Sequence, residues 1–169
     1  MDASYITPYI DATKNVFQTM MGVAVTIGKP QIRDAIPTEA FDVSGIIGMS
    51  GDVIGTVMLS FPMETARKVV ETFTGSEVDV NSEDFGDAIG ELVNMISGGA
   101  KAKFEGKSIS ISCPSIVVGE DHKIQQPSDS ICIHIPCSSE CGTFAVEVAF
   151  KKSSIENVGK NSQTVVSAS

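Results

Sequence analysis

Apolar side chains recur at helical spacing in three stretches of the chain, which is typical of helices with one buried face. The first stretch predicts a helix over about residues 5–21, closed by Gly22 as its C-terminal cap. The second predicts a helix over residues 64–73. The third and longest predicts a helix over residues 84–105, with Ser82 as its N-cap.

Other stretches alternate between apolar and polar residues or are rich in Val and Ile, which favours β-strands. The strongest signal is a hairpin in which residues 41–49 and 53–61 flank the turn sequence Ser50-Gly51-Asp52. A second hairpin is expected where residues 130–135 pair with residues 143–150. Further short strands are expected over residues 23–27, 108–112 and 114–118.

The order of these elements is helix, strands, helix, long helix and strands, which indicates the α+β class. The sequence therefore predicts a mainly antiparallel sheet with the helices packed on one face. We expect one domain over residues 1–151 of the 169, because a single core commonly organises ~100–200 residues. Residues 152–169 are rich in Ser, Asn, Lys and Gly and are expected to form a disordered tail.

The charge balance narrows the classes of partner. The chain has 12 Lys and Arg against 21 Asp and Glu, a formal net charge of −9. Nucleic acids and anionic membrane surfaces both attract basic proteins, so this balance argues against both and favours a partner with exposed Lys or Arg. The longest uncharged stretch, between Lys14 and Lys29, is shorter than the ~20 apolar residues of a membrane helix. With no signal-peptide pattern at Met1, we expect a cytoplasmic protein whose four cysteines are reduced.

The long predicted helix carries polar residues at positions that helix stability does not explain. Its apolar face is opposite a face that carries Asp87, Glu91, Asn94 and Gly98. Residues three apart lie on adjacent turns, so Glu91 and Asn94 are within side-chain reach of one another. Asn and Gly each cost several tenths to ~1 kcal/mol relative to Ala inside a helix. The pattern suggests that this face is kept for a function, the alternative being an ordinary solvated helix face.

The segment Asp87-Ala-Ile-Gly-Glu91-Leu-Val-Asn94-Met resembles the signature of the CheC/CheX/FliY family of chemotaxis phosphatases. In that signature an Asp or Ser is followed by Glu four residues later, by Asn three residues further on, and by a later Pro. Pro114 follows Asn94 by 20 positions, slightly closer than the family pattern, so the carry-over to Glu91 and Asn94 is firmer than that to Pro114.

The likeness extends beyond this motif and covers roughly residues 1–150. It includes the hairpin 45–61, the helix that follows it and the segment 114–119. Two-site members of the family have a second Glu-x-x-Asn helix, whereas the first helix here offers Asp11 and Asn15 at a different spacing. A single site is what the CheX branch of the family would show.

The resemblance implies a CheC/CheX-like fold and a phosphatase that removes phosphate from the phospho-aspartate of a CheY-like response regulator in chemotaxis or related two-component signalling. It implies that Asn94 orients the hydrolytic water and that Glu91 engages a lysine of the regulator. It implies no cofactor bound by this chain, a Mg²⁺ ion on the regulator, and a homodimer. Asp87, Gly98 and Lys101 lie on or close to the same helix face and are candidates for contacts with the partner.

Two other functions stay open. The chain could be a non-catalytic domain that docks a response regulator, as an adaptor or a flagellar-switch-like module. It could also be a metal- or redox-responsive domain, because soft ligands occur at short spacing at Cys132, His134, Cys137 and Cys141. Free cysteines are more often small buried apolar residues. The other histidine, His122, lies beside Glu120 and Asp121 and is expected in a solvated loop.

Overall fold

A computed structural model of the chain describes residues 3–33 and 39–155. The helical elements are η1 (Ala3–Tyr5), α1 (Thr7–Met21), α2 (Met63–Thr74) and α3 (Glu83–Lys101). The strands are β1 (Thr26–Ile27), β2 (Gln31–Arg33), β3 (Phe41–Gly51), β4 (Gly55–Phe61), β5 (Ile109–Ile111), β6 (Ser115–His122), β7 (Ser130–Ser139) and β8 (Gly142–Lys151).

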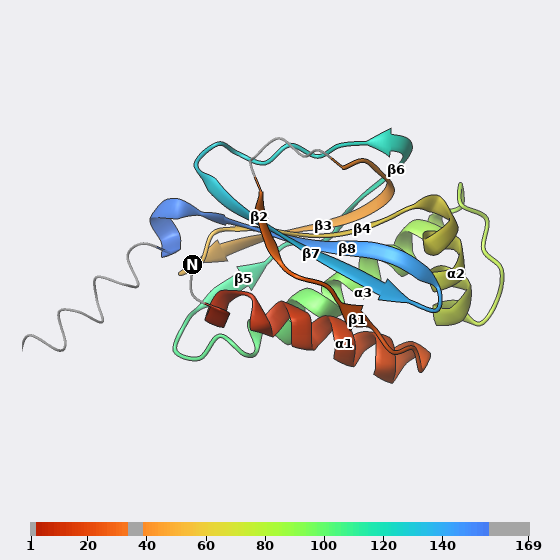
Figure 1. The fold of residues 1–169 in the computed structure, drawn as a ribbon, viewed down its shortest axis with the longest axis horizontal. Helices are drawn as coiled ribbons and strands as arrows, with labels where there is room; N and C mark the ends of the chain where they lie inside the picture. Colours follow the sequence, from red (N-terminus) through yellow and green to blue (C-terminus); the bar gives the residue numbers. More distant parts are fainter. Residues whose placement is uncertain (1–2, 34–38, 156–169) are drawn as a thin grey trace, which may run out of the picture.

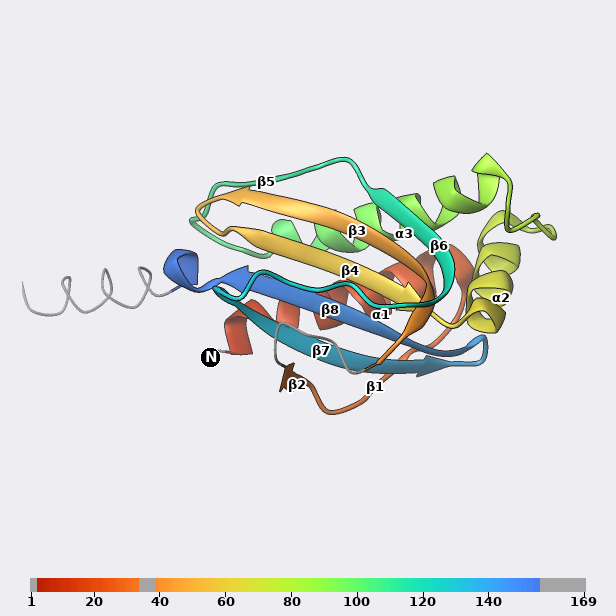
Figure 2. The same cartoon turned by 90° about the horizontal axis from the view of Figure 1, so that it is seen from above.

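The strands form one curled sheet in which every strand pair given by the structure is antiparallel. Its order is β1-β7-β8-β4-β3-β5, with β2 also pairing with β7 and β6 also pairing with β3. The three α-helices lie on one face of this sheet, and the segment between β6 and β7 crosses the other face (Figures 1 and 2). The α+β prediction is therefore confirmed, and so are both predicted hairpins, β3–β4 and β7–β8.

The helix ends follow the expected capping residues. Gly22 has a φ of 65° and closes α1 in the left-handed conformation. The hydroxyl oxygen of Ser82 accepts a hydrogen bond from the Phe85 amide at 3.4 Å and caps α3. The predicted end of α3 at residue 105 is wrong, because the helix ends at Lys101. Phe104 then turns back into the core, where it contacts Tyr9 with ring centroids 6.0 Å apart.

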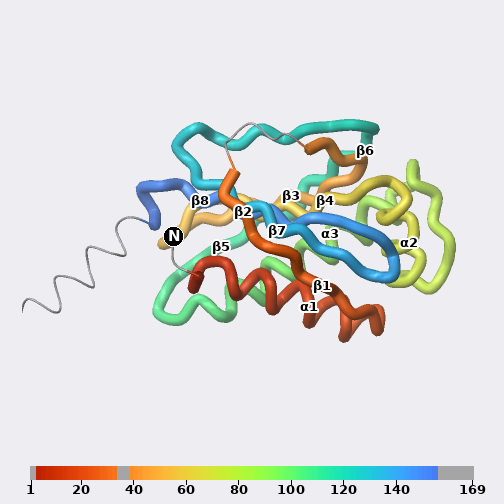
Figure 3. Tube along the Cα trace, viewed as in Figure 1, coloured from red at the N-terminus to blue at the C-terminus, as the bar shows by residue number. Residues whose placement is uncertain are grey.

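Two further expectations need correction or completion. Of the expected strand over residues 23–27, only Thr26–Ile27 pairs as β1, beside β7 at the edge of the sheet that Figure 3 traces. The described residues also continue past 151, the expected end of the domain. Residues 152–155 form a helical turn, in which the Ser154 hydroxyl oxygen accepts a hydrogen bond from the Ile54 amide at 3.2 Å. The remainder of the predicted tail lies outside the described residues.

His122 lies in β6 and not in the solvated loop expected for it. Its Nε2 is 2.7 Å from the Ser44 hydroxyl, and its Nδ1 is 2.8 Å from the Gly119 carbonyl oxygen. Ser44 is in turn 2.7 Å from the Ser60 hydroxyl. The ring therefore connects β6 to the central strands β3 and β4, a tertiary role that the neighbouring acidic residues did not indicate.

An apolar core fills the space between the helices and the sheet. Phe17 anchors α1, because it is fully buried and stacks on Phe144 of β8 with ring centroids 4.8 Å apart. α3 lies directly on β3 at Gly45, where an added Cβ would be 3.0 Å from a Val93 methyl and 3.2 Å from an Ile89 methyl. This close approach seats α3 on the centre of the sheet. Among the described residues, no helix is both long and apolar enough to cross a membrane.

Candidate functional site

A cleft of about 540 Å³ opens between α3 and the connection from β5 to β6. The helix side is lined by Gly86, Asp87, Gly90, Glu91 and Asn94, and the opposite wall by Ile111, Ser112, Cys113, Pro114 and Ile116. The two predicted catalytic residues and one predicted partner contact, Asp87, therefore lie together in one hollow. The other two predicted contacts, Gly98 and Lys101, lie further along the helix, outside the residues that line the cleft.

Glu91 and Asn94 lie on adjacent turns of α3 because the helix is regular at this point. The apolar side of the helix faces the sheet, so Glu91 is left exposed and Asn94 half-buried. Over residues 3–33 and 39–155, neither side chain has a hydrogen bond or an ion pair, and the same is true of Asp87. A carboxylate and a carboxamide without partners, side by side at the rim of a cleft, are available for groups that another molecule brings.

The wall opposite α3 is held firmly to the sheet. The Gly48 amide of β3 donates a hydrogen bond to the Ser112 hydroxyl at 2.9 Å, and the Ser112 amide donates to the Gly48 carbonyl oxygen, also at 2.9 Å. The Ser112 hydroxyl donates in turn to the Cys113 carbonyl oxygen at 2.9 Å. Pro114 follows directly and packs against α3 at Gly90.

Few features of the sequence indicate that this wall belongs to the site. Pro114 was the least firm part of the resemblance, and Ser112 and Cys113 were not considered for the site at all. The one local signal was the glycine before Glu91, an unfavourable residue inside a helix. A residue that tolerates close packing indicates that something approaches the helix there, but the approaching segment is known only from the fold.

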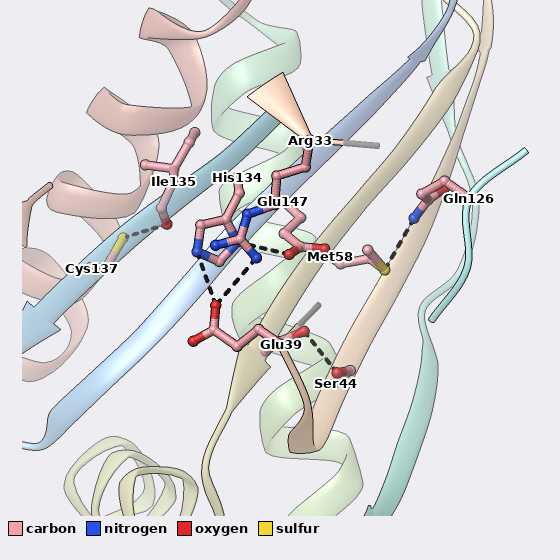
Figure 4. A network of polar contacts seen from close by, with 10 residues as sticks. Arg33, Glu39, Ser44, Met58, Gln126, His134, Ile135, Cys137 and Glu147 are labelled. Atoms are coloured by element: carbon pink, nitrogen blue, oxygen red, sulfur yellow. Dashed lines mark hydrogen bonds and ion pairs between the residues drawn. The ribbon is translucent and has the colours of Figure 1, made fainter. Parts of the chain in front are cut away.

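The cysteine and histidine residues proposed as a metal site do not converge. His134 lies on the sheet face away from the helices (Figure 4), and Cys132, two residues earlier in β7, shares that face, whereas Cys137 and Cys141 belong to the core on the other face. Among the described residues, no group of three or more Cys, His, Asp or Glu is arranged to hold a metal ion. Burial raises the pKa of the Cys132 thiol to about 11, with a further contribution from the Glu147 carboxylate, and raises that of Cys137 to about 12.

His134 instead belongs to a polar network on the outer face of the sheet (Figure 4). Its Nδ1 is 2.8 Å from Glu147 Oε1, and its Nε2 is 3.4 Å from Glu39 Oε2. Arg33 completes the network, since its guanidinium lies 3.3 Å from the Glu39 carboxylate. Both ring nitrogens therefore face carboxylates of this chain and are not free for a metal ion.

A second hollow, of about 430 Å³, lies beside this network. Its lining includes the apolar rings of Phe41, Pro62, Pro136 and Phe144. The ionisable groups at its surface, Glu39 and His134, contact one another, and Glu39 also contacts Arg33. Of the two hollows, the cleft beside α3 is the one that offers carboxylates without partners.

Known proteins resemble this chain over most of its length. The model of a family described as chemotaxis phosphatase CheX matches residues 43–138, a range that includes α3 and the opposite wall. The CheY-P phosphatase CheX of Thermotoga maritima is 33% identical over 141 residues, which span 82% of this chain and 89% of that protein.

Solved structures extend the likeness to three dimensions. A chemotaxis protein CheX from Desulfovibrio desulfuricans superposes with a TM-score of 0.80 at 32% identity, over 86% of this chain and 98% of that one. A CheX-CheY-BeF3-Mg²⁺ complex from Borrelia burgdorferi matches with a TM-score of 0.73 at 27% identity, over 87% of this chain and 97% of that one.

Proposed function

The chain belongs to the CheX family of chemotaxis phosphatases, and from this premise we propose that it hydrolyses the phospho-aspartate of a CheY-type response regulator through Glu91 and Asn94. The observation that carries the proposal is the pair of side chains without partners at the rim of the α3 cleft. A phosphorylated protein can approach these residues because Glu91 is exposed on the helix surface.

We assign to Asn94 the task of orienting the attacking water. An acyl phosphate is already activated, so the reaction needs mainly a water held in line with the bond that breaks. A carboxamide suits this task, because it both donates and accepts hydrogen bonds and brings no charge near the phosphoryl oxygens. A carboxylate at the same place would repel them.

We assign to Glu91 the contact with a lysine of the regulator. The residue is one helical turn from Asn94, so a lysine beside the phosphorylated aspartate can meet it while the phosphoryl group faces the amide. Asp87, one turn earlier, adds a second negative charge on the same side. The chain's net charge of −9 would also accelerate encounters with a basic surface.

In this proposal the Mg²⁺ ion is supplied by the regulator. The complex of CheX with CheY and BeF3 from Borrelia burgdorferi also contains Mg²⁺. When bound beside the phosphoryl group, it neutralises charge that develops there. The steps assigned to Glu91 and Asn94 are contact and water positioning, and neither step uses a metal ligand from this chain.

Timed phosphate release tests the proposed activity. We expect the chain to accelerate release from a phosphorylated CheY-type regulator of the same organism well above the regulator's own rate. A chain that binds the activated regulator without acceleration would instead be the docking module considered from the sequence.

The homodimer stays a prediction, and the sheet offers edges for it at β1 and β2 on one side and β5 and β6 on the other.

Replacing Glu91 by alanine is expected to weaken binding of the activated regulator about tenfold, which corresponds to about 1.4 kcal/mol, because a charged contact is lost. Turnover should fall as well. Titration with a BeF3-activated, fluorescently labelled regulator measures the dissociation constant. The matched control is Glu71→Ala, which removes the same charge from an exposed position on α2. Equal affinities for the two variants would contradict the role assigned to Glu91.

Cys113 offers a reporter for docking in the cleft. It is exposed, whereas the other three cysteines are buried, and the raised pKa values of Cys132 and Cys137 leave little thiolate, the reactive form, at pH 8. We therefore expect one fast-reacting thiol per chain with a disulfide reagent. The BeF3-activated regulator should slow this reaction severalfold, and unactivated regulator at the same concentration should slow it less. An unchanged rate at saturating activated regulator would place docking elsewhere.

A further inference from the structure

We propose that Gly90 is a positioning residue, whose missing side chain lets Pro114 pack against α3 and so sets the width of the cleft beside Glu91 and Asn94. The inference rests on the proposed function for its catalytic consequence. Its structural part, the contact that fixes the cleft, rests on the fold alone.

The approach of the wall to the helix leaves too little space for a methyl group in ordinary van der Waals contact. A Cβ added at Gly90 would lie 3.1 Å from Pro114 Cγ, 3.5 Å from Ile116 Cδ1 and 3.6 Å from Pro114 Cβ. The first distance is shorter than an ordinary van der Waals contact between carbons. The proline ring is closed on its own backbone nitrogen, so Cγ can move only by a change of ring pucker or together with the backbone. The Pro114 ring or the backbone on one side of the cleft would have to shift by a few tenths of an ångström.

Neither side of the cleft has an easy way to move. The wall is tied to β3 before Pro114 by the two hydrogen bonds between Ser112 and Gly48. After Pro114 it is tied again, where Ser115 and Ile116 enter β6 and pair with β3. Opposite it, α3 is seated on β3 by the close contacts at Gly45 and by a fully buried apolar face.

If α3 is the side that moves, the displacement reaches both proposed catalytic residues, Glu91 and Asn94. Gly90 immediately precedes Glu91, and Asn94 follows one turn later, so a shift or rotation of α3 at residue 90 is passed directly to both side chains. Displacements near 1 Å can cost a catalysed reaction about 100-fold. For the few tenths of an ångström needed here, we expect a loss of about fivefold to tenfold in the rate constant.

Helix propensity predicts the opposite direction. Glycine is unfavourable inside a helix, so alanine at residue 90 would by itself strengthen α3. Gly99 provides the matched control, because it lies on the same helix, outside the residues that line the cleft. An added Cβ there meets only Ala12 Cβ, at the ordinary distance of 3.4 Å. Alanine at residue 99 therefore changes propensity without changing the cleft.

The experiment compares Gly90→Ala, Gly99→Ala, Pro114→Ala and the double variant Gly90→Ala/Pro114→Ala. We expect Gly90→Ala to lower kcat about fivefold to tenfold with a much smaller change in KM, and Gly99→Ala to stay within twofold of the unmodified chain. Because alanine at 114 removes the ring that meets the new methyl, the double variant should lose less than the product of the two single losses.

A second measurement does not depend on phosphatase activity. The reaction rate of Cys113 with a bulky thiol reagent reports the opening of the cleft. It should rise at least twofold in Gly90→Ala and return toward the Pro114→Ala value in the double variant. Unchanged labelling in Gly90→Ala overturns the inference whether or not the chain is active, and so does an unchanged kcat in an active chain. Altered labelling in a chain that shows no phosphatase activity supports the Gly90 contact and overturns the proposed function.

Discussion

Asn94→Ala is expected to lower the rate of regulator dephosphorylation by about 100- to 1,000-fold, the loss typical for one preorganised polar group at a reacting centre. The affinity for BeF3-activated regulator should stay within threefold, because docking relies on charge and surface contact and not on the amide. The substitution should not harm the fold, since Asn94 has no partner among the described residues and alanine is the better helix former. Stopped-flow measurement of regulator dephosphorylation, beside an anisotropy titration, separates the two quantities.

Asn15→Ala is the matched control for this variant. It removes the same carboxamide from an exposed position on α1, outside the residues that line the cleft, and should leave the rate unchanged. Asn94→Asp is a second informative variant, because it keeps the shape of the side chain but places a negative charge toward the phosphoryl oxygens. We expect it to be as slow as Asn94→Ala. Full activity in either Asn94 variant would remove this residue from the mechanism.

His134→Leu is expected to lower the free energy of unfolding by about 1.5–3 kcal/mol, the usual contribution of a hydrogen bond to a charged group, because it leaves the buried Glu147 carboxylate without its 2.8 Å partner. The side chains of His134 and Glu147 are 4% and 8% exposed, so water cannot replace the lost contact at the Glu147 carboxylate. The loss is measured by urea denaturation of the variant and the unmodified chain. Phosphatase activity under native conditions should change little, because this network lies on the sheet face opposite α3.

Two further variants show whether the loss of stability is due to burial of an unpaired carboxylate. In the double variant His134→Leu/Glu147→Leu, no charge is left without a partner, so the loss should be smaller than in His134→Leu alone. Lys103→Ala breaks the exposed pair with Asp11, whose side chains are both 48% exposed, and should cost less than 1 kcal/mol. A similar small loss in His134→Leu would contradict the structural role of the network.

The pairing of Glu91 with Asn94 was predictable because it is local. An α-helix fixes the relation of residues three apart, so the period of the apolar residues in α3 was enough to place both side chains on one exposed face. The same reasoning placed Ser82 and Gly22 correctly at helix ends. It failed at residue 105, because Phe104 leaves the helix to reach the core and only the packed structure shows that the core has room for it.

The wall of the cleft was not predictable, because its contacts join residues that are far apart in the sequence. Ser112 contacts Gly48, which is 64 positions away in the sequence, and nothing in either residue's neighbours indicates the partner. His134 is an intermediate case. The alternation of residues along β7 indicates which face its side chain takes, but its partner Glu147 depends on the register of the β7–β8 hairpin, which pairs these two residues directly across the strands.

The composition of the cleft lining has a consequence for selectivity. Among the described residues that line it there is no Lys, Arg or His, and there are two carboxylates, Asp87 and Glu91. A free phosphorylated metabolite is a dianion, and it would meet two carboxylates and no cationic side chain there. On a partner protein that holds a metal ion and a lysine beside the phosphoryl group, these cations neutralise its negative charge. In the proposed mechanism the regulator supplies the cations, so small phosphate esters and acyl phosphates, which bring none, are expected to be poor substrates.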